Sequence, residues 1–153
     1  MTWRRFIFGF ICTTVAIIAM LEEKEPPAFA DLPDSLQAWR QKGEMVDLFG
    51  GLQVFVIQEG NLNVQEDVVV FIHGFPTSSF DYQRSLGHLL EDLKGKKLVF
   101  FDHLGFGFSD KPRDDYEYSI HDHAENLLEL IRVLKLKTVH FVAHDMGDSV
   151  LTE

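Results

Sequence analysis

Cysteine is almost absent from this 153-residue chain, and basic side chains are few compared with acidic ones. The single cysteine, Cys12, cannot form an intrachain disulfide, and it excludes a cysteine-rich zinc site. Lysine and arginine together number 14 against 24 acidic residues, which gives a formal net charge of −10. Because nucleic-acid binding requires a basic face, we expect no nucleic-acid partner and interpret the acidity as a soluble, self-repelling surface.

Two further kinds of site have no pattern in the sequence. The glycines at 105 and 107 do not form the GxGxxG turn of a dinucleotide-binding unit, and no phosphate-binding loop with its lysine is present. The seven histidines nowhere show a helical ligand spacing such as HExxH. We therefore expect no cofactor and no metal.

Charged residues are absent from the apolar run Phe6–Leu21, which follows Arg4 and Arg5 and precedes an acidic segment. As a helix this run would span about 24 Å, somewhat less than a hydrocarbon core of ~30 Å. An uncleaved signal anchor, a cleaved signal peptide and a buried core helix all fit it. The flanking charges favour an anchor with a cytoplasmic N-terminus. We divide the chain into this anchor or signal (1–21), an acidic, proline-containing linker (22–34) and one globular domain (35–153).

The globular part alternates strand-like and helix-like segments. We expect a helix over 34–42, a hairpin from 44–49 and 52–58, buried strands at 68–72 and 98–101, a last strand at 138–143, and helices over 79–93 and from 119 onward. Ser119 and Asp122 predict a capping box for the last of these helices, whose apolar stripe is Ala124, Leu127, Leu128, Ile131 and Leu134. Strands alternating with helices after an initial hairpin predict an α/β fold with a mainly parallel sheet.

The segment His73, Gly74, Phe75 and Pro76 comes directly after the buried strand at 68–72. A glycine there lets the backbone approach a ligand, and a neighbouring N–H can point at a developing oxyanion. A simple strand-ending turn fits the same residues. A second loop, residues 102–112 (DHLGFGFSDKP), follows the next strand and contains two glycines.

The most informative segment is residues 142–148 (VAHDMGD), in which a strand turns sharply into a helix with Asp145 at the tip. A nucleophile on such an elbow needs small neighbours, and Ala143 and Gly147 lie two positions before and after it. The N–H of Met146 would form half of an oxyanion hole. The alternative makes Asp145 an ordinary helix N-cap, since aspartate is favoured there.

Taken together, the three segments come in the order expected of an α/β-hydrolase: oxyanion turn, glycine loop, nucleophile. The chain resembles the epoxide hydrolase and haloalkane dehalogenase branch of that superfamily, whose nucleophile is aspartate. Residues 73–79 (HGFPTSS), 104–112 (LGFGFSDKP) and 144–148 (HDMGD) are most similar to the mesoderm-specific transcript proteins. Members of that family begin with an apolar segment and are associated with the endoplasmic reticulum membrane. The resemblance therefore implies that location, with secretion as the alternative.

The resemblance also implies a mechanism, in which Asp145 attacks a carbon electrophile and forms an alkyl-enzyme ester. A late histidine, oriented by an acid, then activates water to hydrolyse that ester. The N–H groups of Phe75 and Met146 would stabilise the resulting oxyanion. Dehalogenases commonly carry a donor side chain at each of these two positions, so Phe75 and Met146 disfavour dehalogenation. Met146 also replaces the tryptophan usual in epoxide hydrolases, and Asp148 is larger than the residue expected there.

None of the chain's own histidines is predicted to be the catalytic base. His144 adjoins the nucleophile, but adjacent side chains diverge at such a turn. His121 and His123 start a helix and are expected to be solvated, and His140 is expected to pack within a strand. His103 could line the pocket.

The sequence stops at Glu153, before the cap, the later strands and the late histidine of the family. The strand at 138–143 would then be an apolar open edge, and the helix after Asp145 would be too short to be stable alone. We therefore expect the N-terminal part of an α/β-hydrolase fold that is inactive by itself.

The expected function is an epoxide-hydrolase-like hydrolase acting on a small apolar or lipid-like substrate, attached to a membrane through residues 6–21. The alternative is a non-catalytic, membrane-anchored protein that binds a ligand or a partner on the same fold.

Overall fold

The computed structural model describes residues 31–113 and 116–153. The predicted membrane segment 6–21 and most of the predicted linker 22–34 lie outside these residues. In the described part of the chain no helix is both long enough and apolar enough to cross a bilayer. Pro33–Glu153 form one compact unit, and this unit is described below.

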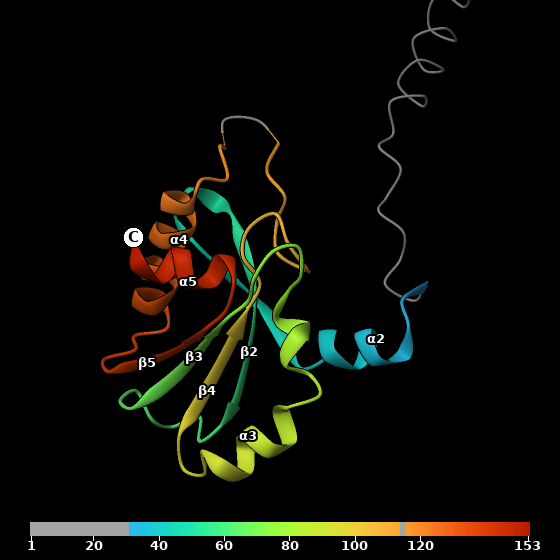
Figure 1. Cartoon of the computed structure of the whole chain (residues 1–153), viewed down its shortest axis with the longest axis vertical. Helices are drawn as coiled ribbons and strands as arrows, with labels where there is room; N and C mark the ends of the chain where they lie inside the picture. Colours follow the sequence, from blue (N-terminus) through green and yellow to red (C-terminus); the bar gives the residue numbers. More distant parts are fainter. Residues whose placement is uncertain (1–30, 114–115) are drawn as a thin grey trace, which may run out of the picture. The chain divides into compact units, whose positions relative to one another are not determined.

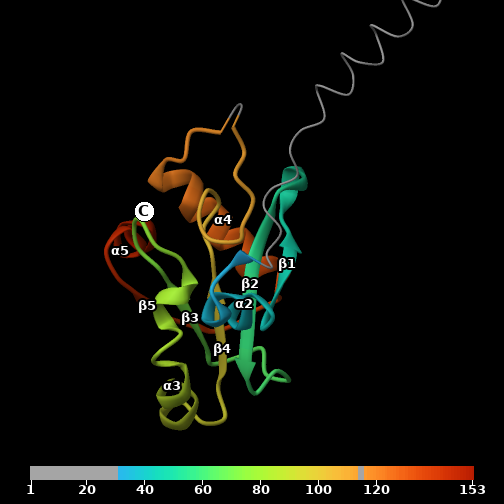
Figure 2. The same ribbon diagram turned by 90° about the vertical axis from the view of Figure 1, so that its right-hand side faces the viewer.

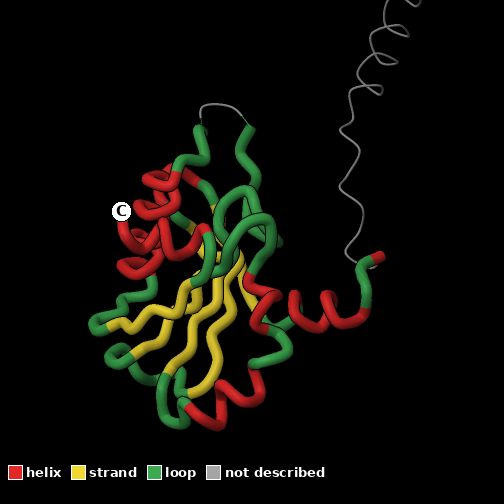
Figure 3. Tube along the Cα trace, viewed as in Figure 1, coloured by secondary structure: helices red, strands yellow, loops and turns green. Residues whose placement is uncertain are grey.

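The unit contains five strands and several short helices (Figures 1 and 3). In chain order they are α2 (Asp34–Arg40), β1 (Gly43–Asp47), the 3₁₀ helix η2 (Phe49–Gly51), β2 (Gln53–Gly60), β3 (Val68–Ile72), the 3₁₀ helix η3 (Ser79–Tyr82), α3 (Leu86–Asp92), β4 (Lys97–Phe101), α4 (Ile120–Val133), β5 (Val139–Ala143) and α5 (Met146–Thr152). The predicted hairpin and the three later strands are confirmed; β3 and β4 are buried along their whole length, whereas β5 is largely exposed.

One mixed sheet has the strand order β1-β2-β4-β3-β5. The hairpin pairs β1 antiparallel to β2, and β2 runs antiparallel to β4. The strands β4, β3 and β5 are parallel to one another. Figure 2 shows β1 and β5 at opposite edges of the sheet. The parallel strands therefore bring the loops that follow β3, β4 and β5 to the same end of the sheet.

Alternate residues of the central strands enter two different cores, as the pleat of a strand requires. On one face Val70, Val99 and their neighbours pack with residues of α4 and α5. On the other face Phe71 and Phe100 stack with ring centroids 4.5 Å apart, and they pack with residues of α2 and α3. The sheet is thus covered by helices on both faces, and the predicted α/β architecture is confirmed.

Two helical predictions were wrong in detail. The helix expected over 79–93 is interrupted, because residues 79–85 turn through hydrogen bonds spanning three residues, such as Gln83 N to Phe80 O at 3.0 Å. The regular helix begins only at Leu86. In α4 the capping box of Ser119 and Asp122 is confirmed. The buried face of α4 is nevertheless shifted: Leu130 is 2% exposed, whereas the expected Leu128 is 52% exposed.

Strand β5 forms one edge of the sheet built by the described residues. Its apolar side chains Phe141 and Val142 are 36% and 42% exposed. The helix that follows it, α5, has seven residues and packs against α4. An apolar strand at an open edge was predicted at this place, and the sheet has one there.

Candidate active site

Asp145 occupies the turn between β5 and α5 in a backbone conformation that side chains rarely adopt. Its φ is 54° and its ψ is −124°. Such angles cost a non-glycine residue about 1–3 kcal/mol and are concentrated at functional sites. An ordinary N-cap residue has β-region angles instead, so the backbone of Asp145 does not match the N-cap alternative, although its side chain does accept a hydrogen bond from Met146 N.

The tight turn at Asp145 depends on two glycines. A Cβ at Gly74 would lie 2.6 Å from the Cβ of Asp145. A Cβ at Gly147 would lie 2.9 Å from the backbone oxygens of Ile72 and His73 at the end of β3. Both distances are shorter than real contacts of a Cβ, so any larger residue would push the elbow away from β3. The side chain of Asp148, which the sequence suggested was too large, is exposed and crowds no part of this turn.

Two backbone amides converge on one oxygen of the Asp145 carboxylate. Phe75 N donates to Oδ1 at 2.9 Å, and Met146 N donates to the same atom at 2.6 Å. The hydrogen bonds from Met146 and then Phe75 hold the pKa of Asp145 below its ordinary value of 3.8. The carboxylate is therefore ionised at neutral pH. Within the described residues Oδ2 accepts no hydrogen bond, so this oxygen is available for other chemistry.

The fully buried His73 holds the turn that carries Phe75 in place. Its Nε2 accepts a hydrogen bond from His103 N at 2.9 Å, and its Nδ1 lies 2.9 Å from Gly74 O. Burial lowers the pKa of His73, so the ring is neutral and Nδ1 is the atom that donates. His73 thus ties the loop after β3 to the loop after β4. Pro76, at the tip of the turn, is exposed and follows a cis peptide bond.

A buried carboxylate that the sequence did not identify joins the same two loops. Asp102 is 0% exposed and accepts hydrogen bonds from Ser79 N and Phe108 N, both at 2.8 Å. A Cβ at Gly107 would lie 1.9 Å from Oδ2 of Asp102, so only glycine fits there. The only signal in the sequence was an acid at the end of a buried strand. This acid holds the glycine loop in place.

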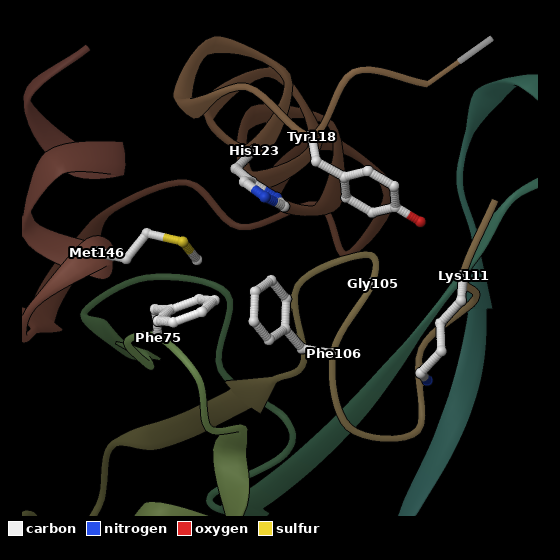
Figure 4. Close-up of a pocket in the computed structure, with 7 residues that line it drawn as sticks. All are labelled: Phe75, Gly105, Phe106, Lys111, Tyr118, His123 and Met146. Atoms are coloured by element: carbon white, nitrogen blue, oxygen red, sulfur yellow. The ribbon is translucent and has the colours of Figure 1, made fainter. Parts of the chain in front are cut away.

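A cavity of about 440 Å³ opens beside the Asp145 turn (Figure 4). Its lining residues are Phe75, Gly105, Phe106, Lys111, Tyr118, His123 and Met146. The two residues whose amides hold Asp145 thus also line the cavity, and Asp145 adjoins them without being one of the lining residues. The Lys111 ammonium donates to the backbone oxygens of Gly107 and Ser109 at 2.8 and 2.9 Å, so two of its three N–H groups are engaged.

The histidines lie partly where the sequence predicted and partly elsewhere. His123 was expected to be solvated, but it is 1% exposed because it continues the buried face of α4. His140 was expected to be packed, but its side chain is 56% exposed and pairs with Asp67 at the sheet edge. His103 is buried and does not line the cavity, and burial lowers its pKa to about 2.

No described residue completes a base or a metal centre beside Asp145. His144 points to Asp81, with 3.4 Å between Nε2 and Oδ2, and is not hydrogen-bonded to Asp145. Among residues 31–113 and 116–153, no three His, Cys, Asp or Glu side chains are grouped so that they could hold a metal ion. The arrangement can therefore present an ionised carboxylate oxygen to an apolar cavity, and can stabilise negative charge on the other oxygen.

Comparison with known proteins gives the same picture. The mesoderm-specific transcript protein of Mus musculus is 34% identical over 91% of this chain, and the chain spans 40% of that protein's length. Among solved structures, the haloalkane dehalogenase DpaA from Paraglaciecola agarilytica NO2 is 33% identical with a TM-score of 0.60, over 69% of this chain and 35% of that one. The epoxide hydrolase VrEH1 from Vigna radiata is 28% identical with a TM-score of 0.61, over 71% and 31% of the two chains.

The alpha/beta hydrolase fold family matches residues 67–147, more than half of the chain. This stretch runs from β3 to the beginning of α5, and it contains the oxyanion turn, the glycine loop and the elbow. The resemblance inferred from the three sequence segments is confirmed. The chain belongs to the α/β-hydrolase fold family.

Proposed function

We propose that Asp145 is the nucleophile of a hydrolase that acts on small apolar electrophiles, with epoxides as the preferred class. The observation that carries this proposal is the strained elbow: an ionised carboxylate is held by two amides on Oδ1, while Oδ2 stays unbonded. A residue kept at a cost of about 1–3 kcal/mol in backbone strain needs a compensating role. The apolar cavity at the same end supplies room for a small substrate.

In the first step, Oδ2 of Asp145 attacks a carbon of the epoxide ring. A carbon–oxygen bond to the carboxylate forms, the ring carbon–oxygen bond breaks, and the released oxygen takes a proton from water. The product of this step is an ester between the enzyme and the opened substrate. The lowered pKa of Asp145 keeps the attacking group ionised, so no base is needed to activate it.

In the second step, water attacks the ester carbon and negative charge develops on Oδ1. The amides of Phe75 and Met146 already donate to this atom, so they stabilise the new charge without rearrangement. This step needs a general base, and among the described residues no histidine is hydrogen-bonded to Asp145. We therefore propose that the described residues can form the ester, and that its release needs a base that they do not supply.

Halide release is the less favoured chemistry for this cavity. A leaving halide needs donor side chains, and neither Phe75 nor Met146 carries one although both line the cavity. An epoxide keeps its oxygen bonded to carbon and has no anion to release. A haloalkane dehalogenase and an epoxide hydrolase resemble the fold of this chain about equally, so the choice between the two reactions rests on the side chains of Phe75 and Met146.

Covalent capture tests the nucleophile. The whole chain is incubated with styrene oxide, and its intact mass and peptide masses are measured. We expect the protein to gain the mass of one styrene oxide on the peptide that contains Asp145, and we expect this gain to be lost in Asp145→Asn. Asp148→Asn is the matched control, because Asp148 is an exposed carboxylate three residues away on α5.

Labelling that continues unchanged in Asp145→Asn, or that appears equally on Asp148, would overturn the proposal. Absence of any adduct on the folded chain would instead favour the non-catalytic, ligand-binding alternative.

We also propose that residues 6–21 anchor the protein in the endoplasmic reticulum membrane. The supporting observation is the uncharged run between Arg5 and Glu22. Extraction of cell membranes with alkaline carbonate tests it, since an uncleaved anchor stays in the pellet and a secreted product appears in the medium.

A further inference from the structure

One polar side chain in the cavity wall has a hydrogen-bonding capacity that the described residues leave unused. His123 lies in the first turns of α4, lines the cavity and is 1% exposed. Its Nδ1 is buried without any hydrogen-bond partner. Buried polar atoms are nearly always paired, so an unpaired one beside a cavity indicates a missing ligand group or a water molecule.

The ring of His123 is held in place by aromatic contacts. Its centroid lies 4.9 Å from that of His103 and 6.1 Å from that of Phe106. In Figure 4 the ring extends from α4 toward Phe106. These contacts fix the imidazole without using its nitrogens. The side chain is therefore positioned to meet a partner in the cavity at little entropic cost.

The remaining polar groups of the wall are already engaged. The Lys111 ammonium is bonded to two backbone oxygens of its own loop. The Tyr118 hydroxyl donates to Pro112 O at 2.5 Å. Among the described side chains that line the cavity, His123 is thus the one with a buried polar atom that has no hydrogen-bond partner.

The charges around the cavity determine which ligands would suit this group. Burial lowers the pKa of His123, so the ring is neutral and offers one donor and one acceptor. The Lys111 ammonium is held by two backbone oxygens, and the carboxylate of Asp145, next to Phe75 and Met146, repels an anion. The apolar side chains of Phe75, Phe106 and Met146 cannot solvate a charge. An uncharged ligand with a single oxygen function fits these conditions.

We propose that His123 is a specificity-determining residue, which hydrogen-bonds an oxygen, such as a hydroxyl or an ether, on an otherwise apolar and uncharged substrate. This inference rests on the proposed function, because it takes the cavity beside Asp145 as the substrate site. It does not require Asp145 to react. Binding can therefore be measured separately from the chemical step.

Two probes of equal shape isolate the hydrogen bond: 2-phenylethanol, and n-propylbenzene, in which a methyl group replaces the hydroxyl. Affinities are measured by NMR titration of the whole chain and of its His123→Phe variant, which keeps the ring contacts. Since one hydrogen bond contributes about 1 kcal/mol, we expect the variant to bind 2-phenylethanol about five- to tenfold more weakly. Its affinity for n-propylbenzene should not fall.

A matched variant and a second measurement make the test independent of folding. His121→Phe changes an exposed histidine on the same turn of α4 and should leave both affinities unchanged. In the unmutated chain, the imidazole ¹⁵N resonances of His123 should shift with 2-phenylethanol and not with n-propylbenzene.

Three outcomes would overturn the inference. Equal loss of both probes in His123→Phe would assign the residue to packing. An unmutated chain that binds both probes but shows no ¹⁵N shift with the alcohol would mean that water or nothing fills the contact. Failure of both probes to bind would show that the cavity is not a ligand site, whatever Asp145 does in the styrene oxide experiment.

Discussion

Replacement of Gly147 by alanine tests how closely the elbow is packed. The new Cβ would lie 2.9 Å from Ile72 O, His73 O and Ile72 Cγ2. Two of these atoms are backbone oxygens at the end of the central strand β3, and Ile72 O also accepts a hydrogen bond from Tyr82 at 2.9 Å. Neither oxygen can move without disturbing β3 or that bond. Overpacking of this kind costs about 1–3 kcal/mol.

Part of this cost is offset, because alanine is favoured over glycine inside a helix by up to ~1 kcal/mol. We therefore expect Gly147→Ala to lower the free energy of unfolding by about 1–2 kcal/mol. With a urea m-value of ~2 kcal/mol/M, the midpoint falls by roughly 0.5–1 M. Because Met146 precedes the displaced residue, its amide should also move from Oδ1 of Asp145, and styrene oxide labelling should slow.

Gly87→Ala is the matched control. Gly87 lies in α3, and a Cβ there would meet no atom within 4 Å. The helical preference for alanine then acts alone, so the urea midpoint should rise, with a gain of about 0.5–1 kcal/mol. If Gly147→Ala stabilised the chain as Gly87→Ala does, the elbow would not be packed against β3, and contact with β3 could not hold Asp145 in its strained conformation.

Two more changes have a predictable sign. Burial lowers the pKa of His103 from 6.5 to about 2, so the stability that its neutral form contributes is fully present above pH 6.5 and is lost as the pH falls below that value. Between pH 7.5 and 5.5 the free energy of unfolding should drop by ~1.4 kcal/mol from this residue alone. Urea titrations of His103→Phe should show a smaller drop than those of His88→Phe, in which an exposed histidine is replaced. Ser119→Ala removes the acceptor for Asp122 N, and thermal or urea unfolding should show a loss of about 1 kcal/mol; a stability equal to that of the unmutated chain would mean that the capping box contributes nothing.

The sequence was sufficient to predict the succession of strands along the chain and the turns that form the backbone of the candidate site. Continuous apolar runs such as Val68–Ile72 are typical of strands covered on both faces, and the glycines that follow them indicate tight turns. Asp145 by itself fitted a helix N-cap equally well, and only the three segments together favoured the nucleophile elbow. The pairing of Ser119 with Asp122 is equally legible, since a capping box is local in the chain.

Features that depend on distant contacts were not predictable. Leu128 and Leu130 differ by two positions, and only the placement of α4 on the sheet decides which one is buried. The same placement buries His123 and brings it beside Phe106. The role of Asp102 was not predictable from its place at the end of a buried strand, because its partners Ser79 and Phe108 come from two different loops.

Phe75 and Met146 serve the site in two chemically independent ways, through a backbone amide that faces Asp145 and a side chain that faces the cavity. Every amino acid except proline supplies the amide, so nearly any residue at these two positions preserves the charge-stabilising geometry. The side chains are then free to change what the cavity accepts. Substitutions at positions 75 and 146 can therefore change which molecules the cavity accepts while the two amides keep their places, and a library of substitutions there, with proline left out, tests this separation.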